Sequence, residues 1–473
     1  MYDTLVWGRI NDEDLIHFEA LVGKDQVVVD QNRLKEYDHD YTEDLHFLPQ
    51  VVLIPQTANQ IAAVLKHCNL RKIPLTVRGA GTGLSGGALP IHGGVLLSME
   101  KMNRILEIDE RNLQATVEPG VITQVFQEAV EAKGLFYPPD PASKGSCFIG
   151  GNLAENSGGP KAVKYGVTKD YVLNLEVALP DGRLFWTGAN VLKNATALNL
   201  TQLMIGSEGT LGVITKAVFR LIPLPKFDLL MLVPFRKAEQ ACEAVSAIFS
   251  LGITPSGLEF MERDALDFAK QYIPGIELEI EVGVEAHLLI ELDGNYQDVL
   301  LKEAEEIYNL LNHYDCAEVL MADSKAEKDK LWKLRRSLGE AVKNNSIYKE
   351  EDTVVKRAEL PQLLKGVKAI GKEYGFRSVC YGHAGDGNLH VNILKGEMSD
   401  EQWQGAHLKQ GIREIFKLCK ALGGTISGEH GIGLVQKEYM DVLFSPEDIA
   451  LQKAIKKVFD PNGILNPGKV WMD

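Results

Sequence analysis

The chain has 473 residues, of which 45% are hydrophobic and 24% charged, and its formal net charge is −15 at pH 7. This composition indicates a globular protein of about two to four domains, at roughly 150 residues per domain, and excludes extensive disorder. The acidic balance, without clusters of lysine and arginine, excludes DNA and RNA as partners.

No stretch approaches the ~18 consecutive apolar residues of a membrane span, and the N-terminal residues lack the basic-then-apolar layout of an export signal. We therefore expect a cytoplasmic protein, in which contact with a membrane would be peripheral and made through a partner. The six cysteines are scattered and form no C-x-x-C pair. They predict reduced thiols and no iron–sulfur cluster held by this chain.

The first half of the chain alternates between strand and helix patterns after a polar, helix-like N-terminal segment, residues 1–45. The pattern predicts a βαβ unit, then a hairpin, a helix and a long Gly-rich region. The expected elements are strands at 51–54 and 74–77 around a helix at 58–70, a hairpin at 104–109 and 113–118, and a helix at 121–133. Leu224-Pro225 is the clearest domain boundary.

The second half begins with a different pattern at Phe227. The order β, helix, β, β, helix, β resembles a split βαβ, ferredoxin-like layer with helical additions. The expected strands are 229–233, 257–261, 285–292 and 318–322, and the expected helices are 238–251 and 298–312. Strands at 377–383 and 388–394 flank a Gly/Asp turn and predict a hairpin, after which residues 409–473 return as helices.

A Gly-rich loop, Arg78–Gly87, directly follows the second predicted strand. Glycines let the backbone approach a phosphate closely, and successive N–H groups form an anion-binding nest. Residues 81–86 match the dinucleotide fingerprint G-x-G-x-x-G, but Pro90 and the paired glycines after it prevent the helix that a Rossmann site requires. We therefore expect a different pyrophosphate-binding loop. A Gly-rich connection without a ligand is the alternative.

Two further stretches, 149–172 and 206–212, are also dense in small residues. Glycine costs backbone entropy on folding and contributes no packing, so these stretches would make a poor hydrophobic core. A bound ligand would offset that cost.

Near the C-terminus, two histidine-containing motifs suggest a metal site. On one continuous strand His383 and His390 would face opposite sides, but the turn at 384–387 reverses the chain, so both can face one cavity together with Asn392. Glu429, from the Ser-Gly-Glu-His-Gly motif, would complete a His₂Glu set that suits zinc, iron, manganese or cobalt. Turn glycines with surface histidines are the alternative.

The loop at 78–87, the Gly-rich stretches at 149–172 and 206–212, and Asn466-Pro-Gly-Lys469 resemble the FAD-linked oxidases and dehydrogenases of the vanillyl-alcohol oxidase type. The Gly-His-x-x-Asp-Gly-Asn-x-His and Gly-Glu-His-Gly motifs resemble its D-2-hydroxy-acid branch, which holds the glycolate oxidase catalytic subunit, D-lactate dehydrogenases and D-2-hydroxyglutarate dehydrogenases. The resemblance implies an α+β fold with a two-subdomain FAD-binding domain at 46–225 and a ferredoxin-like substrate cap at 226–415. A segment at 416–473 would complete the FAD site and the active site, and residues 1–45 would form a separate N-terminal helical segment.

The resemblance also implies roles for individual residues. His383, His390 and Glu429 match the metal ligands, and His430 matches the proposed base. Arg335 matches the arginine that holds the substrate carboxylate, unless Arg336 takes that role and Arg335 is a helix-surface charge. Asn392 is expected to contact the substrate. The residues expected to contact FAD are Arg78, Gly79, Ala80, Gly81, Thr82, Gly83, Leu84, Ser85, Gly86, Pro139, Gly150, Gly151, Asn156, Gly158, Gly166, Val172, Gly212, Ile214 and Asn466. The pyrophosphate loop contains no His or Cys, so a covalent flavin bond is not expected.

The choice of substrate depends on the segment 348–352. Dicarboxylate-specific relatives carry a lysine there, whereas this chain has Glu350, or a shifted Lys349, opposite that position. An acidic residue would repel a distal carboxylate and favours D-lactate or glycolate. Lys349 at that position would bind the second carboxylate and favours D-2-hydroxyglutarate.

The expected reaction is FAD-dependent oxidation of a D-2-hydroxy acid to the 2-oxo acid. The metal would acidify the hydroxyl, His430 would take its proton, and a hydride would pass to flavin N5. Dioxygen, a quinone, a cytochrome, an electron-transferring flavoprotein or an iron–sulfur subunit would then accept the electrons, and a homodimer is the default assembly. A metal-dependent hydrolase and a non-catalytic flavoprotein subunit are the alternative functions.

Overall fold

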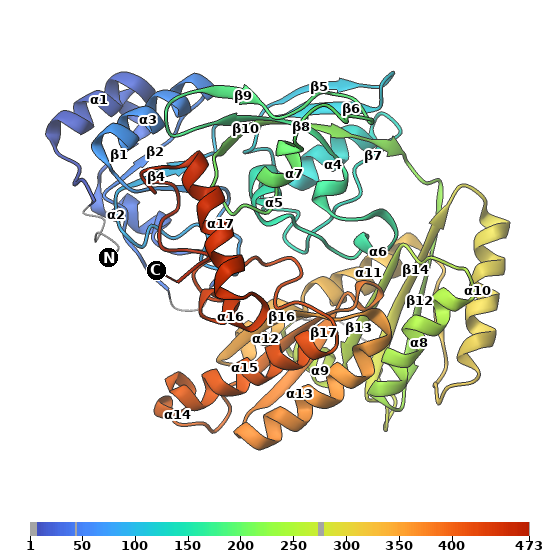
Figure 1. The fold of residues 1–473 in the computed structure, drawn as a ribbon. Helices are drawn as coiled ribbons and strands as arrows, with labels where there is room; N and C mark the ends of the chain where they lie inside the picture. The colour runs from blue at the N-terminus through green and yellow to red at the C-terminus, as the bar shows by residue number, and fades with distance from the viewer. Residues whose placement is uncertain (1–6, 43–44, 273–278, 473) are drawn as a thin grey trace. The chain divides into compact units, whose positions relative to one another are not determined.

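The computed structural model describes residues 7–42, 45–272 and 279–472 (Figure 1). It divides into two compact units. The first unit comprises Met1–Ser157, Val167–Leu224 and Glu429–Asp473, and the second comprises Gly158–Gly166 and Pro225–Gly428. Apart from the inserted segment Gly158–Gly166, the chain enters the second unit at Leu224-Pro225, where the sequence predicts a boundary, and returns to the first at Glu429. Residues 1–6 and 43–44 of the predicted N-terminal helical segment lie outside the described residues.

The first sheet of the first unit has the strand order β1-β2-β4-β3, in which β2, β4 and β3 run parallel. Its strands are β1 (Val27–Val28), β2 (Val51–Leu53), β3 (Leu75–Arg78) and β4 (Val95–Ser98). Helix α3 (Ala58–Arg71) begins after Thr57, whose hydroxyl accepts the Gln60 N–H. The predicted βαβ unit is confirmed, but β4, which was not predicted, lies between its two strands.

Two further helices of the N-terminal segment belong to this layer, α1 (Asp12–Val22) and α2 (Gln31–Leu34). Phe18 of α1 and Ile61 and Leu65 of α3 are fully buried in one core with strands β2, β3 and β4. Burial of each such side chain contributes about 1.5–3 kcal/mol to the free energy of folding. This core holds strand β3 in place, and the Gly-rich loop begins at the end of that strand.

The second sheet of the first unit is antiparallel, with the order β5-β6-β10-β8-β9. It contains the predicted hairpin, and Phe126 of the predicted helix α4 packs against Tyr137 and Phe219 with ring centroids 4.9 and 5.6 Å away. Its strands are β5 (Ile105–Asp109), β6 (Gln114–Val117), β8 (Val172–Ala178), β9 (Leu184–Trp186) and β10 (Val213–Arg220). The same part of the chain also contains α4 (Thr123–Glu131), α5 (Ile149–Glu155) and α7 (Leu200–Met204), and β7 (Leu135–Phe136) pairs with β11 (Ile222–Pro223) in a separate two-stranded sheet.

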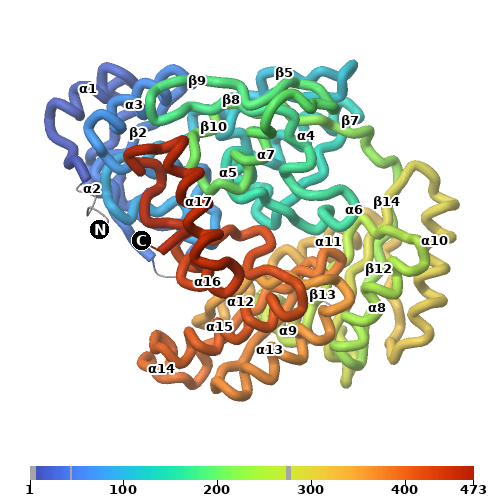
Figure 2. The backbone as a smooth tube through the Cα atoms, in the orientation of Figure 1, coloured from blue at the N-terminus to red at the C-terminus, as the bar shows by residue number. Residues whose placement is uncertain are grey.

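The C-terminal residues return to the first sheet, where the red end of the tube lies beside the blue strands in Figure 2. After α16 (Met440–Leu443) and α17 (Pro446–Phe459), the Leu75 N–H donates to Ile464 O and the Asn466 N–H donates to Leu75 O. These bonds bring Asn466 next to the strand that leads into the Gly-rich loop.

The second unit is built on a seven-stranded sheet with the order β15-β12-β14-β13-β17-β18-β16. With β12 to β15 numbered one to four, the first part has the order four, one, three, two, which is that of a ferredoxin-like layer. Helices α8 and α10 pack on β12 and β14 (Figure 1). The bounds are β12 (Phe227–Phe235), α8 (Ala238–Ser250), β13 (Gly257–Glu262), α9 (Arg263–Tyr272), β14 (Ala286–Gly294), α10 (Gln297–Leu311) and β15 (Leu320–Ala322). The predicted ferredoxin-like layer is confirmed.

Three more strands extend this layer beyond β13 and include the predicted hairpin, β17 and β18. Helices α9, α11 and α12 pack on the opposite face through a core that contains Met261, Leu334 and Tyr381. The bounds are α11 (Lys325–Arg336), α12 (Leu338–Asn345), β16 (Tyr348–Val354), α13 (Leu360–Tyr374), β17 (Arg377–Gly382), β18 (Asn388–Leu394), α14 (Asp400–Gln404) and α15 (Ala406–Ala421), with α6 (Ala162–Tyr165) from the inserted segment. None of the helices in the described ranges combines the length and apolar character needed to cross a bilayer.

Candidate active site

The hairpin of β17 and β18 brings His383 and His390 together. A single 3₁₀ turn, Ala384–Asp386, reverses the chain, and the two ring centroids lie 5.5 Å apart. Gly387 has φ +78°, and a Cβ there would lie 2.0 Å from Val355 O, so the turn requires glycine. Both histidines are more than nine-tenths buried. The prediction that the turn brings both histidines to the same side is confirmed, and the alternative of surface histidines is wrong.

A carboxylate lies beside Nδ1 of each imidazole. The His383 Nδ1 is 2.9 Å from Glu259 Oε2, and the His390 Nδ1 is 3.3 Å from Glu350 Oε1. A neutral imidazole that donates its Nδ1 proton to a carboxylate keeps Nε2 as a lone-pair donor. In that form each ring would offer Nε2 to a metal ion.

Glu259 of β13 is the centre of this arrangement. Its side chain is fully buried, and the Arg335 Nη2 lies 2.6 Å from its Oε2. Burial alone would raise the pKa of Glu259, but the neighbouring charges of His383 and Arg335 hold that pKa below its ordinary value. The carboxylate is therefore ionised near neutral pH.

Arg335 comes from the last turn of α11 and is 5% exposed, so the alternative of a helix-surface charge is wrong. Its guanidinium lies over the Tyr381 ring, whereas that of Arg336 lies over Trp332, each 5.3 Å from the ring centroid. Among the described residues, no acceptor satisfies the buried Arg335 Nε. A buried donor of this kind fits a ligand carboxylate.

The register of β16 against β18 decides between Glu350 and Lys349. Glu350 pairs with Asn392 and Asp352 pairs with His390, so these four side chains lie on one face. Lys349 lies on the opposite face, with its ammonium 5.4 Å from the centroid of the Trp403 ring. Contact between Lys349 and the substrate stays a prediction, but this register favours Glu350, because one residue of register moves a side chain to the other face of a sheet.

Asp352 fixes the chain just before Glu429. Its Oδ2 accepts the Ser427 hydroxyl at 3.0 Å and the Gly428 N–H at 2.7 Å, and its Oδ1 accepts the Asn388 amide at 2.6 Å. A Cβ on Gly428 would lie 2.6 Å from Val354 Cγ2, so this approach also requires glycine. Glu429 and His430 follow directly in sequence and belong to the first unit.

Within the first unit, Glu208 holds the loop that carries His430. Its carboxylate accepts the N–H groups of Ile432 and Gly433 at 2.8 and 2.6 Å, and the Leu434 N–H donates to Ser85 O at 2.7 Å. Glu208 itself has φ +50°, a left-handed conformation that is strained for a residue with a side chain. The loop of His430 is thereby tied to the Gly-rich loop at Ser85.

The C-terminal motif also binds the Gly-rich loop. The amide of Asn466 donates to Gly87 O at 3.1 Å and to Glu208 O at 2.7 Å, and Lys469 Nζ donates to Gly87 O at 2.7 Å. Burial lowers the pKa of Lys469 to about 7. The side chain of Asn466, from the Asn-Pro-Gly-Lys motif, therefore contacts the Gly-rich loop directly.

The Gly-rich loop has the donor set that a pyrophosphate needs. In the described part of the chain, no backbone N–H between Gly79 and Ala88 donates to a protein acceptor. The buried Ser85 Oγ likewise has no partner among those residues. No helix follows the loop, as predicted, so it is not a Rossmann site. Unpaired N–H groups on a half-buried loop fit a bound diphosphate.

The other residues expected to contact FAD are divided between the units. Arg78 uses Nη1 to bind His39 O at 2.6 Å, and Asn156, at φ +56°, ends α5. Packing explains two glycines directly, since a Cβ on Gly150 would meet Pro119 at 2.7 Å and one on Gly212 would meet Val177 at 2.5 Å. The first unit holds Arg78–Gly86, Pro139, Gly150, Gly151, Asn156, Val172, Gly212, Ile214 and Asn466, and the second holds Gly158 and Gly166. Their contacts with FAD stay predictions.

Sequence reasoning missed Glu259, Asp352 and Glu208. The signal for Glu259 is a carboxylate inside the apolar strand Gly-Leu-Glu-Phe-Met. Asp352 and Glu208 stand in recognised segments, but their partners are 75 and 224 residues away in the chain. Only the fold identifies those partners.

Comparisons with known proteins of similar sequence and fold agree with the geometry described above. The family described as "FAD binding domain" matches residues 49–188, and "FAD linked oxidases, C-terminal domain" matches residues 224–470. The chain belongs to the FAD-linked oxidase family. It is therefore an FAD-linked oxidoreductase, and the Gly-rich loop Arg78–Gly87 lies within the part that matches the FAD-binding domain.

Three relatives of this FAD-linked oxidase extend over nearly its whole length. A glycolate oxidase subunit GlcD of Bacillus subtilis is 39% identical and covers 92% of each chain. A D-lactate dehydrogenase of Anaerostipes hadrus is 36% identical over 98% of each chain. A D-2-hydroxyglutarate dehydrogenase of Stutzerimonas stutzeri is 35% identical over 96% of this chain and 97% of its own.

The solved structure of p-cresol methylhydroxylase with bound substrate shares the fold. It superimposes with a TM-score of 0.78 at 20% identity and covers 98% of this chain and 97% of its own. The vanillyl-alcohol oxidase-type fold predicted from the motifs is thereby confirmed.

The Gly-rich loop yields a direct prediction. Apart from Gly83 and its two neighbours in the chain, no atom of the described residues lies within 4 Å of a Cβ built on Gly83, so Gly83→Val leaves the fold intact but fills the space beside the unpaired N–H groups. We expect the purified variant to lose most of its visible flavin absorbance while its circular dichroism stays that of the parent. Gly145→Val is the matched control, since its nearest neighbour is the movable end of Gln124. A fully yellow Gly83→Val protein would contradict the assignment of the loop.

Proposed function

We propose that this FAD-linked oxidase converts a D-2-hydroxy monocarboxylate, such as D-lactate or glycolate, to the 2-oxo acid. The observation that carries the proposal is the buried network in which Glu259 binds Arg335 and His383 together. It sets a carboxylate-binding guanidinium and a metal-competent imidazole on one carboxylate, and a 2-hydroxy acid needs both functions. The names of the three relatives support the same substrate class.

We further propose that His383, His390 and Glu429 hold a divalent cation, which can be zinc, iron, manganese or cobalt. Two imidazoles with carboxylates at Nδ1 are the donor set such an ion requires. Glu429 is covalently next to Gly428, which Asp352 fixes on β16. When bound, the cation supplies Lewis acidity that lowers the pKa of a hydroxyl group.

In this proposal each residue of the chain has one task. Arg335 binds the carboxylate of the substrate, using the guanidinium edge that Glu259 leaves open, and so orients the C2 hydroxyl. Asn392 contacts the substrate from the same face as His390. His430 accepts the hydroxyl proton, and Glu208 keeps its loop in place. Bound FAD supplies the two-electron acceptor.

The face that carries Glu350 favours a small substrate. The acidic side chain of Glu350 lies beside His390 and would repel a second carboxylate, and Lys349 lies on the other face, so neither residue supplies a positive charge for a dicarboxylate. We therefore expect D-lactate and glycolate to be better substrates than D-2-hydroxyglutarate.

The six cysteines are scattered and provide no set of iron–sulfur cluster ligands, so electrons would have to leave the flavin for an acceptor outside this chain. We propose that the reduced enzyme passes its electrons to a separate quinone, electron-transferring flavoprotein or iron–sulfur subunit. A homodimer in the cytoplasm, peripheral to the membrane through that partner, is the arrangement we propose for the cell.

Replacement of His430 tests the chemistry. We expect His430→Ala to retain its FAD but to reduce it about 10²–10⁴-fold more slowly on anaerobic mixing with D-lactate, because the general base is lost. The measurement is the stopped-flow loss of flavin absorbance, with glycolate, D-2-hydroxyglutarate and L-lactate in parallel. His407→Ala, on the exposed face of α15, is the control. Flavin reduction at the parental rate would remove His430 from this role, and no reduction of the parent by any of these acids would refute the proposed reaction.

Replacement of Glu350 tests the specificity. Glu350→Gln keeps an oxygen beside His390 but removes the charge, so the ratio of kcat/KM for D-2-hydroxyglutarate to that for D-lactate should rise by about tenfold or more. Lys349→Gln, one residue away on the other face, should leave the ratio unchanged. A change with Lys349→Gln and none with Glu350→Gln would show that the register argument is wrong.

A further inference from the structure

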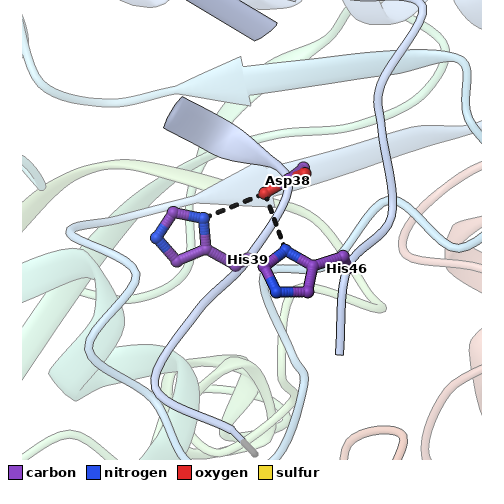
Figure 3. Close-up of side chains that lie close together, drawn as sticks. All are labelled: Asp38, His39 and His46. Carbon is purple, nitrogen blue, oxygen red and sulfur yellow. Dashed lines mark hydrogen bonds and ion pairs between the residues drawn. The ribbon is translucent and has the colours of Figure 1, made fainter. Parts of the chain in front are cut away.

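A second group of metal-ligand side chains lies in the first unit, in the segment before β2. The Nδ1 atoms of His39 and His46 lie 2.9 and 3.1 Å from the same oxygen of Asp38, its Oδ1 (Figure 3). One ligand atom from each of the three residues lies within 4.8 Å of the others. These residues have no part in the proposed oxidation.

The backbone around these side chains is fixed by hydrogen bonds. The Phe47 N–H donates to Asp38 O at 2.7 Å and so holds the residue after His46 next to Asp38. Asp40 accepts the Thr42 N–H at 2.9 Å. The carboxylate of Asp38 is 16% exposed, but the two imidazoles are 49% and 63% exposed. The donor atoms are therefore held near one point that solvent can reach.

We propose that Asp38, His39 and His46 bind a divalent transition-metal cation of the zinc class. Two imidazoles and one carboxylate are the ligands that zinc, cobalt, nickel and copper prefer, whereas calcium and magnesium require mainly oxygen. A cation between the three groups would take the place of the hydrogen bonds between both rings and Asp38. Water completes the tetrahedral coordination, as in zinc sites with three protein ligands.

The position of this cation gives it a structural effect. The His39 carbonyl accepts Arg78 Nη1, and the Tyr41 N–H donates to Gly83 O at 3.2 Å. The loop that holds the cation is thus hydrogen-bonded at two places to the pyrophosphate loop of the FAD-binding domain. A ligand that binds only the folded loop stabilises it by mass action, so the cation should raise the unfolding midpoint and slow the loss of FAD.

A similar group elsewhere in the unit provides a matched control. The rings of His17 and His67 stack at 4.3 Å, and His67 lies 2.7 Å from Asp14. Both oxygens of Asp14, however, are bound by Arg71 at 3.0 and 3.2 Å. The guanidinium occupies the place of a cation, so this group should not bind metal.

The test is a metal titration of the FAD-loaded enzyme after treatment with chelator. Zinc bound per chain is measured by equilibrium dialysis, and cobalt is used in parallel for its visible ligand-field bands. We compare the parent with the double variant His39→Ala/His46→Ala, with Asp38→Asn, with His17→Ala and with His383→Ala. The double variant should lose one class of bound metal, together with the metal-dependent rise in unfolding midpoint, and should still be reduced by D-lactate. His17→Ala should bind as the parent does.

The outcomes separate this inference from the metal site of the proposed function. Metal lost in His383→Ala but kept in both the double variant and Asp38→Asn would overturn the inference and leave the proposed function standing. Metal lost only in the latter two would support the inference and remove the cation from the oxidation site. If the parent binds no metal, both are refuted.

Discussion

The ion pair and hydrogen bond of Glu259 are the constraint on which the candidate site depends. A fully buried carboxylate is costly unless its charge is compensated, and here Arg335 and His383 compensate it together. Removing one member of such a buried group typically costs about 3–5 kcal/mol, because the remaining charges lose their partner. The network therefore fixes α11, β13 and the end of β17 to one another, and with them Arg335 and His383, for which we propose roles in substrate and metal binding.

The two units contribute different parts of the chemistry. The first unit provides unpaired N–H groups on a glycine loop and the segment of His430, which Glu208 and Ser85 hold. The second provides paired imidazoles and a buried arginine on one antiparallel sheet. Asp352 fixes the last residues of the second unit before the chain continues into Glu429. Hydrogen bonds between residues far apart in the sequence thus hold the chain on both sides of Glu429 and His430.

Local signals in the sequence were sufficient for much of this structure. The Gly/Asp turn between two alternating runs predicted both the hairpin and the common side of His383 and His390, because turn chemistry and strand period are local properties. Pro90 and the glycines near it likewise excluded a helix after the pyrophosphate loop. Strand β4 was missed because its four residues stand alone between loops, without a helix pattern beside them.

Long-range pairing decided the rest. Glu259 and His383 are 124 residues apart, and no local pattern shows that they meet. Lys349 and Glu350 differ by one position, and only the pairing of β16 with β18 shows which of them faces Asn392. The same holds for Arg335 and Arg336, since the helix pattern allows either to be buried.

The most direct test of the account is the metal requirement of Glu259→Gln. After treatment with chelator, the metal concentration that half-restores flavin reduction by D-lactate should be about 10- to 100-fold higher than in the parent, because His383 loses the carboxylate that orients it. The KM for D-lactate should rise with it, since Arg335 loses the same support, while Glu397→Gln in the exposed turn after β18 should behave as the parent. A folded, yellow Glu259→Gln protein with unchanged metal requirement and unchanged KM would contradict the account.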